Sequence, residues 1–248
     1  MITLRPQDTV HKAHLLRVLT EIVDNQILSS SLYFKGGTCA SMIGILDRFS
    51  VDLDFDLKAK SDEKEIRSEF HKIFKKLGYE IDQESKKALE FFLKYPSPAN
   101  DRNTLKIDAL NFIVKSNTYR PIFLAEINRT VNCQDEETIF ANKLVAVKDR
   151  FDHKQKIAGR DIYDIHHFFS LNLNYNHKVV VERSRMSVLE YLIFLRDFIE
   201  KNVTQTLLDQ DLNTLLPVAT FSKIRKYLKN ETIMFLNNEI SRLRSKEN

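Results

Sequence analysis

Two spacings of apolar residues alternate along the first half of the chain, and together they predict a mixed α+β fold. Helical spacing occurs over residues 9–27, 38–46 and 61–77. Strand-like patterns occur over residues 31–35, 50–57, 88–95, 105–112 and 121–127, with a turn expected over 96–103.

From about residue 135 the pattern becomes helical and stays so to the end. We expect helices over residues 136–151, 160–171, 178–201 and 219–245. The change predicts an α/β core over residues 1–134, opened by an N-terminal helix, and a helical part over residues 135–248.

The composition of the 248 residues excludes several classes of protein. With 43% apolar and 29% charged residues the chain can build a core, so it is not disordered or fibrous. Two distant cysteines, Cys39 and Cys133, argue against a disulfide framework or a cysteine zinc site. No apolar run reaches membrane-spanning length and the N-terminus lacks a signal-peptide core, so we expect a cytoplasmic protein with no membrane partner. The net charge of +4 permits RNA as a partner without requiring it.

The most informative stretch is a strand pattern that carries three aspartates. Over residues 50–57, Leu53 and Phe55 point to one face, whereas Asp52, Asp54 and Asp56 point to the other. Aspartate is a poor strand former and like charges in a row repel, so three aspartates on one strand face indicate a function for their charges. An Asp-x-Asp pair can hold magnesium, whose shell is completed by phosphates and water. The alternative is a solvated polar face.

A further carboxylate is predicted on another strand. Lys106 and Asp108 share one face of the 105–112 strand, opposite Ile107 and Ala109. If that strand lies beside the first, Asp108 completes a cluster of three carboxylates suited to two metal ions. Alternatively, Asp108 is solvated or paired with a cation.

Paired glycines stand between a predicted strand and a predicted helix, in the segment that runs from Lys35 through Gly36 and Gly37 to Thr38. Glycines let the backbone approach a ligand closely, and the first amides of a helix suit a phosphate. Thr38 is expected to cap the helix or to donate its hydroxyl to a phosphate oxygen. An ordinary turn would also contain such glycines. The order of strand, glycine turn, helix and Asp-x-Asp strand is nevertheless typical of nucleotidyltransferase cores.

Two helices of the second half carry charges near their apolar stripes. Lys143 falls at the edge of the 136–151 stripe with Arg150 on the same side, where it either reaches solvent or contacts a phosphate. Asp161 lies within the apolar arc of the next helix, and Asp164 lies at its edge. A buried carboxylate needs a partner, so we expect Asp161 to meet a cation. Its candidates are Lys143, Arg150 and Arg48.

The histidines do not form a predicted metal site. His166 and His167 are expected on the outer side of the 160–171 helix. The spacing from Arg160 to His166 also matches a loose pattern of some helical ribonucleases, which gives one alternative function.

Taken together, these pieces resemble the AbiEii-type nucleotidyltransferase toxins of type IV toxin–antitoxin and abortive-infection systems, which include the MenT group. The resemblance covers about residues 30–170. Its motifs are Lys35-Gly36-Gly37-Thr38, Arg48-x-Ser50-x-Asp52-x-Asp54-Phe55, Asp108, Asn142-Lys143-Leu144-x-Ala146 and Arg160-Asp161-x-x-Asp164.

The resemblance implies a nucleotidyltransferase-like mixed sheet, with the helical part completing the active-site cleft. It implies a nucleoside triphosphate (NTP) as substrate, Mg²⁺ or Mn²⁺, and a cognate antitoxin encoded alongside. The residues implied to bind the NTP are Lys35, Gly36, Gly37, Thr38, Arg48 and Ser50. The implied catalytic residues are Asp52, Asp54, Asp108, Lys143, Asp161 and Asp164, of which Asp52, Asp54 and Asp108 would hold metal. The choice between Asp161 and Asp164 as the last acidic residue stays open.

The implied reaction is transfer of a nucleotide to the acceptor end of tRNA, which would block translation and serve phage defence. The alternatives are transfer to a protein or small molecule, and a non-catalytic NTP-binding or antitoxin-binding module. The C-terminal basic residues either guide an RNA backbone or form an ordinary solvated surface. They are Lys223, Arg225, Lys226, Lys229, Arg242, Arg244 and Lys246.

Overall fold

The computed structural model describes residues 6–97, 102–111 and 114–247. The chain forms two compact units. The first contains the described residues up to Asn111 together with Thr118–Asp135, and the second contains Val114–Asn117 and the residues from Glu136 onward. Each unit is built around its own set of buried apolar side chains.

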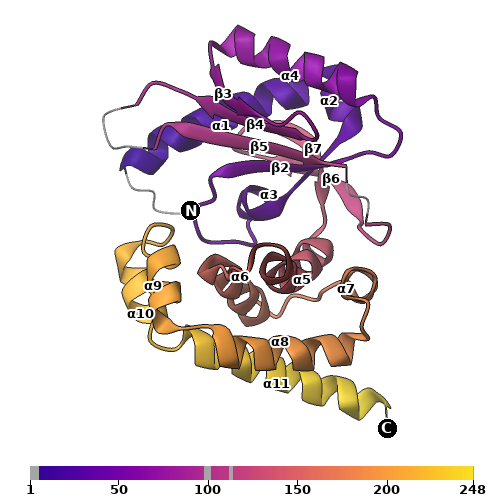
Figure 1. The fold of residues 1–248 in the computed structure, drawn as a ribbon, viewed down its shortest axis with the longest axis vertical. Helices are drawn as coiled ribbons and strands as arrows, with labels where there is room; N and C mark the ends of the chain where they lie inside the picture. Colours follow the sequence, from indigo (N-terminus) through magenta and orange to yellow (C-terminus); the bar gives the residue numbers. More distant parts are fainter. Residues whose placement is uncertain (1–5, 98–101, 112–113, 248) are drawn as a thin grey trace. The chain divides into compact units, whose positions relative to one another are not determined.

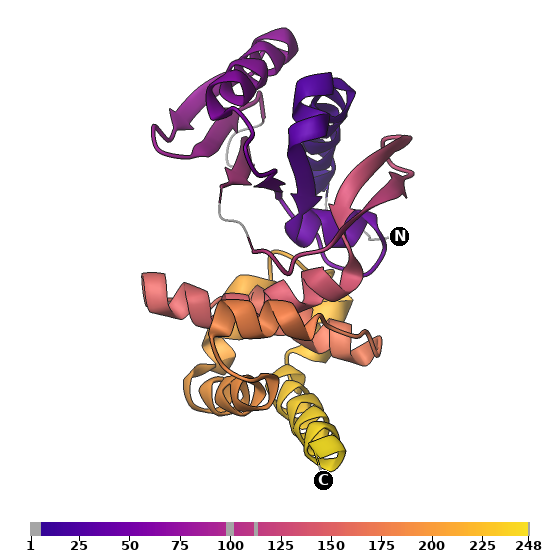
Figure 2. The same cartoon turned by 90° about the vertical axis from the view of Figure 1, so that its right-hand side faces the viewer.

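A mixed sheet forms the centre of the first unit (Figure 1). In the described part of the chain its strands lie in the order β3-β4-β5-β2-β1-β7-β6. They are β1 Leu32–Lys35, β2 Asp52–Leu57, β3 Glu80–Glu84, β4 Leu89–Lys94, β5 Thr104–Leu110, β6 Tyr119–Leu124 and β7 Arg129–Gln134. The pairs β2–β5 and β1–β7 are parallel, and the other neighbours are antiparallel. The β6–β7 hairpin forms one edge of the sheet (Figure 2).

One face of this sheet is apolar because buried apolar side chains alternate with polar ones along central strands such as β4 and β5. The helices of this unit are α1 Pro6–Asp24, α2 Gln26–Ser31, α3 Gly36–Met42 and α4 Glu63–Leu77. Phe70 and Phe74 of α4 pack against Phe91 of β4, and α1 contacts β2 and β5. The opposite face therefore carries the polar side chains of the same strands.

The elements of the first unit confirm most of the expected pattern and add three that it did not predict. Helix α2 is separate from α1 because Asn25 caps it, its side chain accepting a hydrogen bond from the Leu28 amide. Strand β3 was not expected because it is a largely exposed edge strand without alternation. Strand β7 follows a turn in which Asn128 has a φ of 53°. Residues 98–101 of the expected turn and residue 112 of the expected strand lie outside the described residues.

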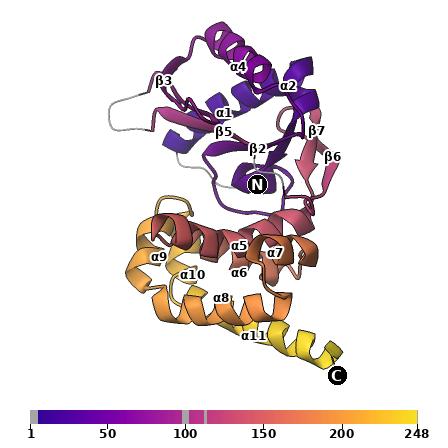
Figure 3. The ribbon, with the colours of Figure 1, turned by 45° about the vertical axis from the view of Figure 1, so that its right-hand side comes forward.

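The second unit is helical. Its helices are α5 Glu136–Lys154, α6 Gly159–Ser170, α7 His177–Ser184, α8 Val188–Asn202, α9 Gln205–Leu212, α10 Val218–Ile224 and α11 Leu228–Glu247. Helix α5 packs on α6 and α7, and α8 lies along α11 (Figure 3). Phe140 of α5 meets Phe168 and Phe169 of α6 edge to face. None of the helices in the described ranges is long and apolar enough to span a bilayer.

Two expected long helices are each split in the structure. The helix expected over 178–201 stops at Arg185, which has a left-handed φ of 59°, and α8 begins after Ser187. Ser187 and Glu190 form a capping box, a start signal that the apolar spacing does not show. The helix expected over 219–245 is likewise divided into α10 and α11, and the short α9 was not expected.

Candidate active site

In the first unit, candidate site residues lie on the polar face of β2. Asp52 and Asp54 are half-buried on this face, whereas Leu53 and Phe55 are buried on the other. The alternation that predicted this arrangement is therefore confirmed. Two carboxylates on one strand face can contribute oxygen ligands to the same divalent ion.

The glycine turn lies directly against these carboxylates. Gly36 opens α3 with a φ of 78°, and a methyl group at this position would collide with the Asp54 carboxyl group, its carbon lying 3.0 Å from the Asp54 Cβ. A methyl group on Gly37 would lie 2.7 Å from the Ser50 Oγ and 3.4 Å from an Arg48 nitrogen. The paired glycines are thus required by close packing of the turn on the motif that contains Arg48, Ser50 and Asp54.

Thr38 has a structural contact that the sequence did not predict. Its hydroxyl donates to the backbone carbonyl of Asp52 at 2.5 Å, and the residue is 4% exposed. The N-cap position of α3 is occupied by Lys35. The expectation that Thr38 caps the helix is therefore wrong, and its hydroxyl ties α3 to the start of β2.

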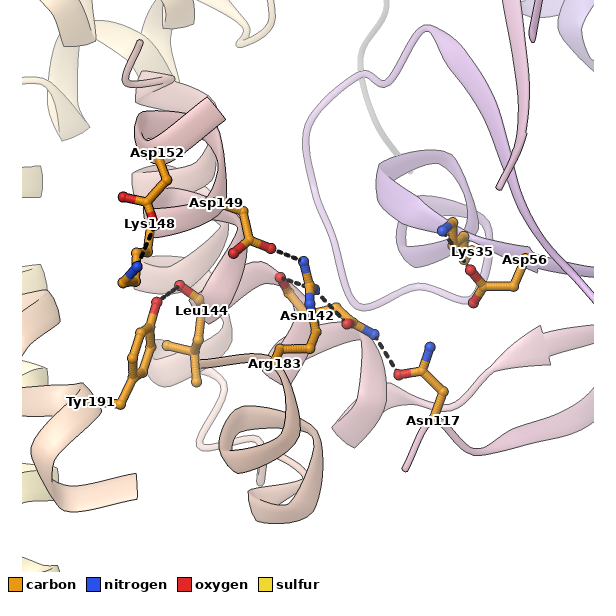
Figure 4. A network of polar contacts seen from close by, with 10 residues as sticks. All are labelled: Lys35, Asp56, Asn117, Asn142, Leu144, Lys148, Asp149, Asp152, Arg183 and Tyr191. Carbon is orange, nitrogen blue, oxygen red and sulfur yellow. Dashed lines mark hydrogen bonds and ion pairs between the residues drawn. The ribbon is translucent and has the colours of Figure 1, made fainter. Parts of the chain in front are cut away.

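Lys35 and Asp56 form an ion pair inside the first unit (Figure 4). The Lys35 Nζ lies 2.6 Å from Asp56 Oδ1, while Tyr119 and Gln134 donate to Asp56 Oδ2 at 2.8 and 2.7 Å. Asp56 is 4% exposed. The third aspartate of the strand thus links β2 to β1, β6 and β7, and the Lys35 ammonium already has a partner.

The strand that carries Asp108 lies next to β2, as the three-carboxylate hypothesis required. In the parallel β2–β5 pair, Asp54 is in register with Asp108 and Asp52 with Lys106. The Lys106 Nζ lies 2.8 Å from Asp108 Oδ2, so the lysine two residues earlier pairs with this carboxylate. Asp108 Oδ1 is buried and has no hydrogen-bond partner in the described part of the chain.

The carboxylates of the candidate site differ in how well they fit a metal ion. Among the described residues no group of three histidine, cysteine or acidic side chains is placed to hold an ion. Within the described ranges, the expected cluster of three carboxylates is therefore not arranged around a common metal position, and Asp108 Oδ2 is bound by Lys106. Asp52 and Asp54 still fit magnesium, which is commonly bound by one or two carboxylates and completed by substrate phosphates and water.

The second unit contains a compact group of buried charges on α5 and α6. The Lys143 Nζ lies 2.7 Å from Asp164 Oδ2 and 3.8 Å from Asp161 Oδ1. The Arg150 Nε lies 2.9 Å from Asp161 Oδ2. Asp164 and Asp161 have side chains 0% and 2% exposed, and that of Lys143 is 16% exposed. The expectation that Asp161 meets a cation is confirmed, and Lys143 does not extend into solvent.

Neighbouring polar residues contact the middle of α5, and the sequence analysis did not predict them. Arg183 of α7 donates to the Asn142 side chain at 2.6 Å and pairs with Asp149. The Asn142 side chain donates to Asn117 at 3.1 Å (Figure 4). The presence of Asn142 beside Lys143 in the motif was the available signal for this support.

A buried histidine also supports β2 and was not predicted. His11 of α1 is 0% exposed and its Nε2 donates to the Val51 carbonyl at 2.8 Å, one residue before Asp52. The other ring nitrogen lies 2.6 Å from the Tyr95 hydroxyl oxygen. Burial lowers the pKa of His11 to about 4, so the ring is neutral near pH 7.

Other sequence expectations are corrected by the structure. His166 is not on an outer face: it is 8% exposed and contacts Glu231 of α11 at 2.8 Å. Most of the C-terminal basic residues are exposed, as a solvated surface would require, and three of them also make contacts within the second unit. Arg225 pairs with Asp209, Lys229 donates to the carbonyls of Glu200 and Val203, and Arg242 pairs with Glu239.

Several solved structures have the same fold, and their matches cover nearly the whole of this chain. A nucleotidyltransferase from Helicobacter pylori matches with a TM-score of 0.62 and 19% identity, covering 99% of this chain and 100% of that one. JHP933 from Helicobacter pylori matches with a TM-score of 0.56 and 17% identity, covering 99% and 100%. MenT4, a nucleotidyltransferase toxin of Mycobacterium tuberculosis, matches with a TM-score of 0.54 and 15% identity, covering 95% and 87%. No curated protein matches the sequence.

A family model provides the assignment that the fold alone does not. The model of the nucleotidyl transferase AbiEii toxin, type IV toxin–antitoxin system, matches residues 17–223. This match includes the glycine turn, the Asp-x-Asp strand and the Lys143 group. The family implies an NTP substrate and an antitoxin partner. The chain therefore belongs to the AbiEii family of nucleotidyltransferase toxins.

Proposed function

We propose that this protein is a divalent-cation-dependent toxin that transfers a nucleotide from an NTP to the acceptor end of tRNA and so blocks translation in the cytoplasm. The observation that carries the catalytic part is the packing of the Gly36–Gly37 turn on Asp54 and Ser50. Because the glycines let the turn approach Asp54 this closely, its backbone lies beside the proposed cation site, where it can contact a phosphate bound to the cation. The tRNA acceptor, the role in phage defence and the antitoxin come from the family resemblance.

The phosphate-binding role is proposed for the backbone of Gly36 and Gly37, the Ser50 hydroxyl and the Arg48 guanidinium. Ser50 and Arg48 both line the turn, and Arg48 is 3% exposed. For Lys35 and Thr38 the proposal departs from the expectation, because each side chain already binds another part of the fold. Their proposed role is to hold the turn against β2.

The cation-binding role is proposed for Asp52 and Asp54. A bound Mg²⁺ or Mn²⁺ would supply charge stabilisation at the phosphates. Asp108 is proposed to accept the proton of the attacking hydroxyl, and its unpartnered Oδ1 supports this role. As the new oxygen–phosphorus bond forms, the bond to pyrophosphate breaks and the electron pair leaves with pyrophosphate.

The proposed functional pair in the second unit is Lys143 and Asp164. Lys143 is assigned to the triphosphate from the family pattern. Asp164 is the proposed acidic residue of the last motif because it is the closer of the two aspartates to the Lys143 ammonium. Asp161, which is held by Arg150, is proposed to support this pair.

The test is a transfer assay with Mg²⁺ in which each labelled NTP is incubated separately with total tRNA. We expect label in tRNA with the intact protein and none with Asp52→Ala. A matched control is Asp82→Ala, which removes an aspartate of β3 that pairs with Lys94 instead. No labelled tRNA, together with measurable NTP binding, would reject the tRNA acceptor and favour transfer to a protein or small molecule. Absence of NTP binding would reject the transferase proposal itself.

A further inference from the structure

The polar face of the sheet carries its own cation. Lys106 stands on β5 beside Asp52 of β2 and Phe92 of β4, and its Nζ lies 5.8 Å from the centre of the Phe92 ring. Its side chain is 28% exposed. The ammonium is therefore held on the same strand face as the two proposed cation-binding carboxylates.

Acidic side chains surround this ammonium. Asp108 Oδ2 lies 2.8 Å from the Lys106 Nζ, and Glu90 Oε1 lies 3.6 Å from it. Glu90 is in register with Asp108 in the β4–β5 pair, and Asp108 is in register with Asp54 in the β2–β5 pair. Three carboxylates thus lie across neighbouring strands, with one covalently attached cation among them.

Lys106 stays charged in this setting. Burial by itself would lower the pKa of its ammonium, but the hydrogen bond to Asp108 and the charges of Asp108, Glu90 and Asp54 raise it. A permanent positive charge therefore neutralises part of this acidic face. Because like charges repel at short range, a divalent ion on Asp108 would have to displace the ammonium.

We propose that Lys106 takes the place of a second metal ion, so that the protein binds a single divalent cation through Asp52 and Asp54. This inference rests on the proposed function. In two-metal transferases a further carboxylate helps hold the second ion. Here the corresponding carboxylate, Asp108, is bound by Lys106, which also orients it. Lys106 is thus a positioning residue that acts through Asp108.

The test counts Mn²⁺ ions bound to the full chain by electron paramagnetic resonance, in the presence of a saturating non-hydrolysable NTP analogue. We expect about one ion for the wild type and about one more for Lys106→Met, because the freed Asp108 and Glu90 can then hold a second cation. Lys106→Arg, which keeps the positive charge, should bind the same number of Mn²⁺ ions as the wild type. Lys94→Met is the matched control, since Lys94 lies on the adjacent strand and pairs with Asp82.

A second measurement follows the transfer rate as a function of Mg²⁺ concentration. We expect a hyperbolic dependence for the wild type and for Lys106→Arg, and a sigmoidal one for Lys106→Met. Two Mn²⁺ ions on the wild type would overturn the inference even if Lys106→Met fails to fold. An unchanged ion count in a folded Lys106→Met would overturn it as well. Failure of the analogue to bind at all would instead reject the proposed function.

Discussion

Asp54 on β2 lies in register with Asp108 on the parallel strand β5, so that two carboxylates meet across neighbouring strands. Like charges placed side by side on a sheet are destabilising. Such an arrangement is expected where a site needs the charges for binding rather than for folding. The stability and the activity of the protein should therefore respond differently to substitutions at this position.

The first prediction concerns Asp54. Asp54→Asn removes one charge from the pair, so transfer should fall by about 100-fold or more while the melting temperature stays the same or rises. The rate is measured with the labelled NTP and the melting temperature by circular dichroism. Asp82→Asn serves as the control and should leave the rate unchanged. A folded Asp54→Asn protein with wild-type activity would contradict the site assignment.

The second prediction separates backbone strain from steric conflict at the glycine turn. Gly36 and Gly78 have similar positive φ angles of 78° and 72°, yet a methyl group at Gly78 meets nothing within 4 Å. Gly78→Ala should therefore cost about 1 kcal/mol of unfolding free energy and keep full activity. Gly36→Ala should cost more and abolish transfer, because its methyl group would displace the Asp54 carboxylate. Urea unfolding measures the stability and the transfer assay measures the activity. Equal losses of both in Gly36→Ala and Gly78→Ala would reject the steric conflict with Asp54.

The third prediction ranks the two aspartates of α6. Asp164→Asn leaves the half-buried Lys143 ammonium without its closer aspartate and should lower the unfolding free energy by about 3 kcal/mol. Asp161→Asn should cost less, because the Arg150 side chain is 29% exposed and can turn toward water. Adding Lys143→Met to the Asp164→Asn variant should restore part of the loss. If Asp161→Asn lowers the unfolding free energy more than Asp164→Asn does, the assignment of Asp164 to Lys143 is wrong.

The fourth prediction tests whether Lys35 acts on substrate or on the fold. Lys35→Met leaves Asp56 buried without its cation, so we expect a lower melting temperature, with a loss of about 3 kcal/mol. The KM for NTP should change little if Lys35 does not touch the triphosphate. Lys35→Met/Asp56→Leu, which removes both charges, should recover stability. A large rise in the KM for NTP without loss of stability would instead show that Lys35 contacts the NTP.

The fifth prediction concerns acid stability. Because the pKa of His11 falls from 6.5 in the unfolded chain to about 4 in the fold, the unfolded state binds more protons between these values. This contribution to stability is thus present near pH 7 and lost as the pH falls, by roughly 2 kcal/mol between pH 7 and pH 5. His11→Gln should show a correspondingly smaller loss over this range in urea unfolding. An identical pH dependence in both proteins would show that His11 does not contribute.

Local patterns in the sequence were enough to predict several parts of the site. The two-residue period of a strand assigns Asp52 and Asp54 to one face whatever lies beside them. The glycine pair between a strand and a helix likewise indicated a close backbone approach. The family motifs then linked these separate pieces, and the family model, which matches residues 17–223, confirms the family.

Contacts between distant residues could not be predicted in this way. The period of β2 places Asp56 with Asp52 and Asp54, but only the neighbouring strands β1, β6 and β7 supply its partners Lys35, Tyr119 and Gln134. The helical stripe of α6 indicated that Asp161 needs a cation. It did not show that Arg150 would hold it and leave Asp164 to Lys143.

The sequence by itself determined which side chains share a strand face or a helix side, because local geometry sets those directions. The tertiary structure alone decided which strands and helices become neighbours, since that depends on packing of the whole unit. The pairing of β5 with β2 is the clearest case: it places Asp108 beside Asp54, as predicted, and also brings Lys106 into the same group of charges. Asp108, which was expected to bind metal, is therefore paired with Lys106. The sequence could not show this, because the pairing depends on how the strands pack.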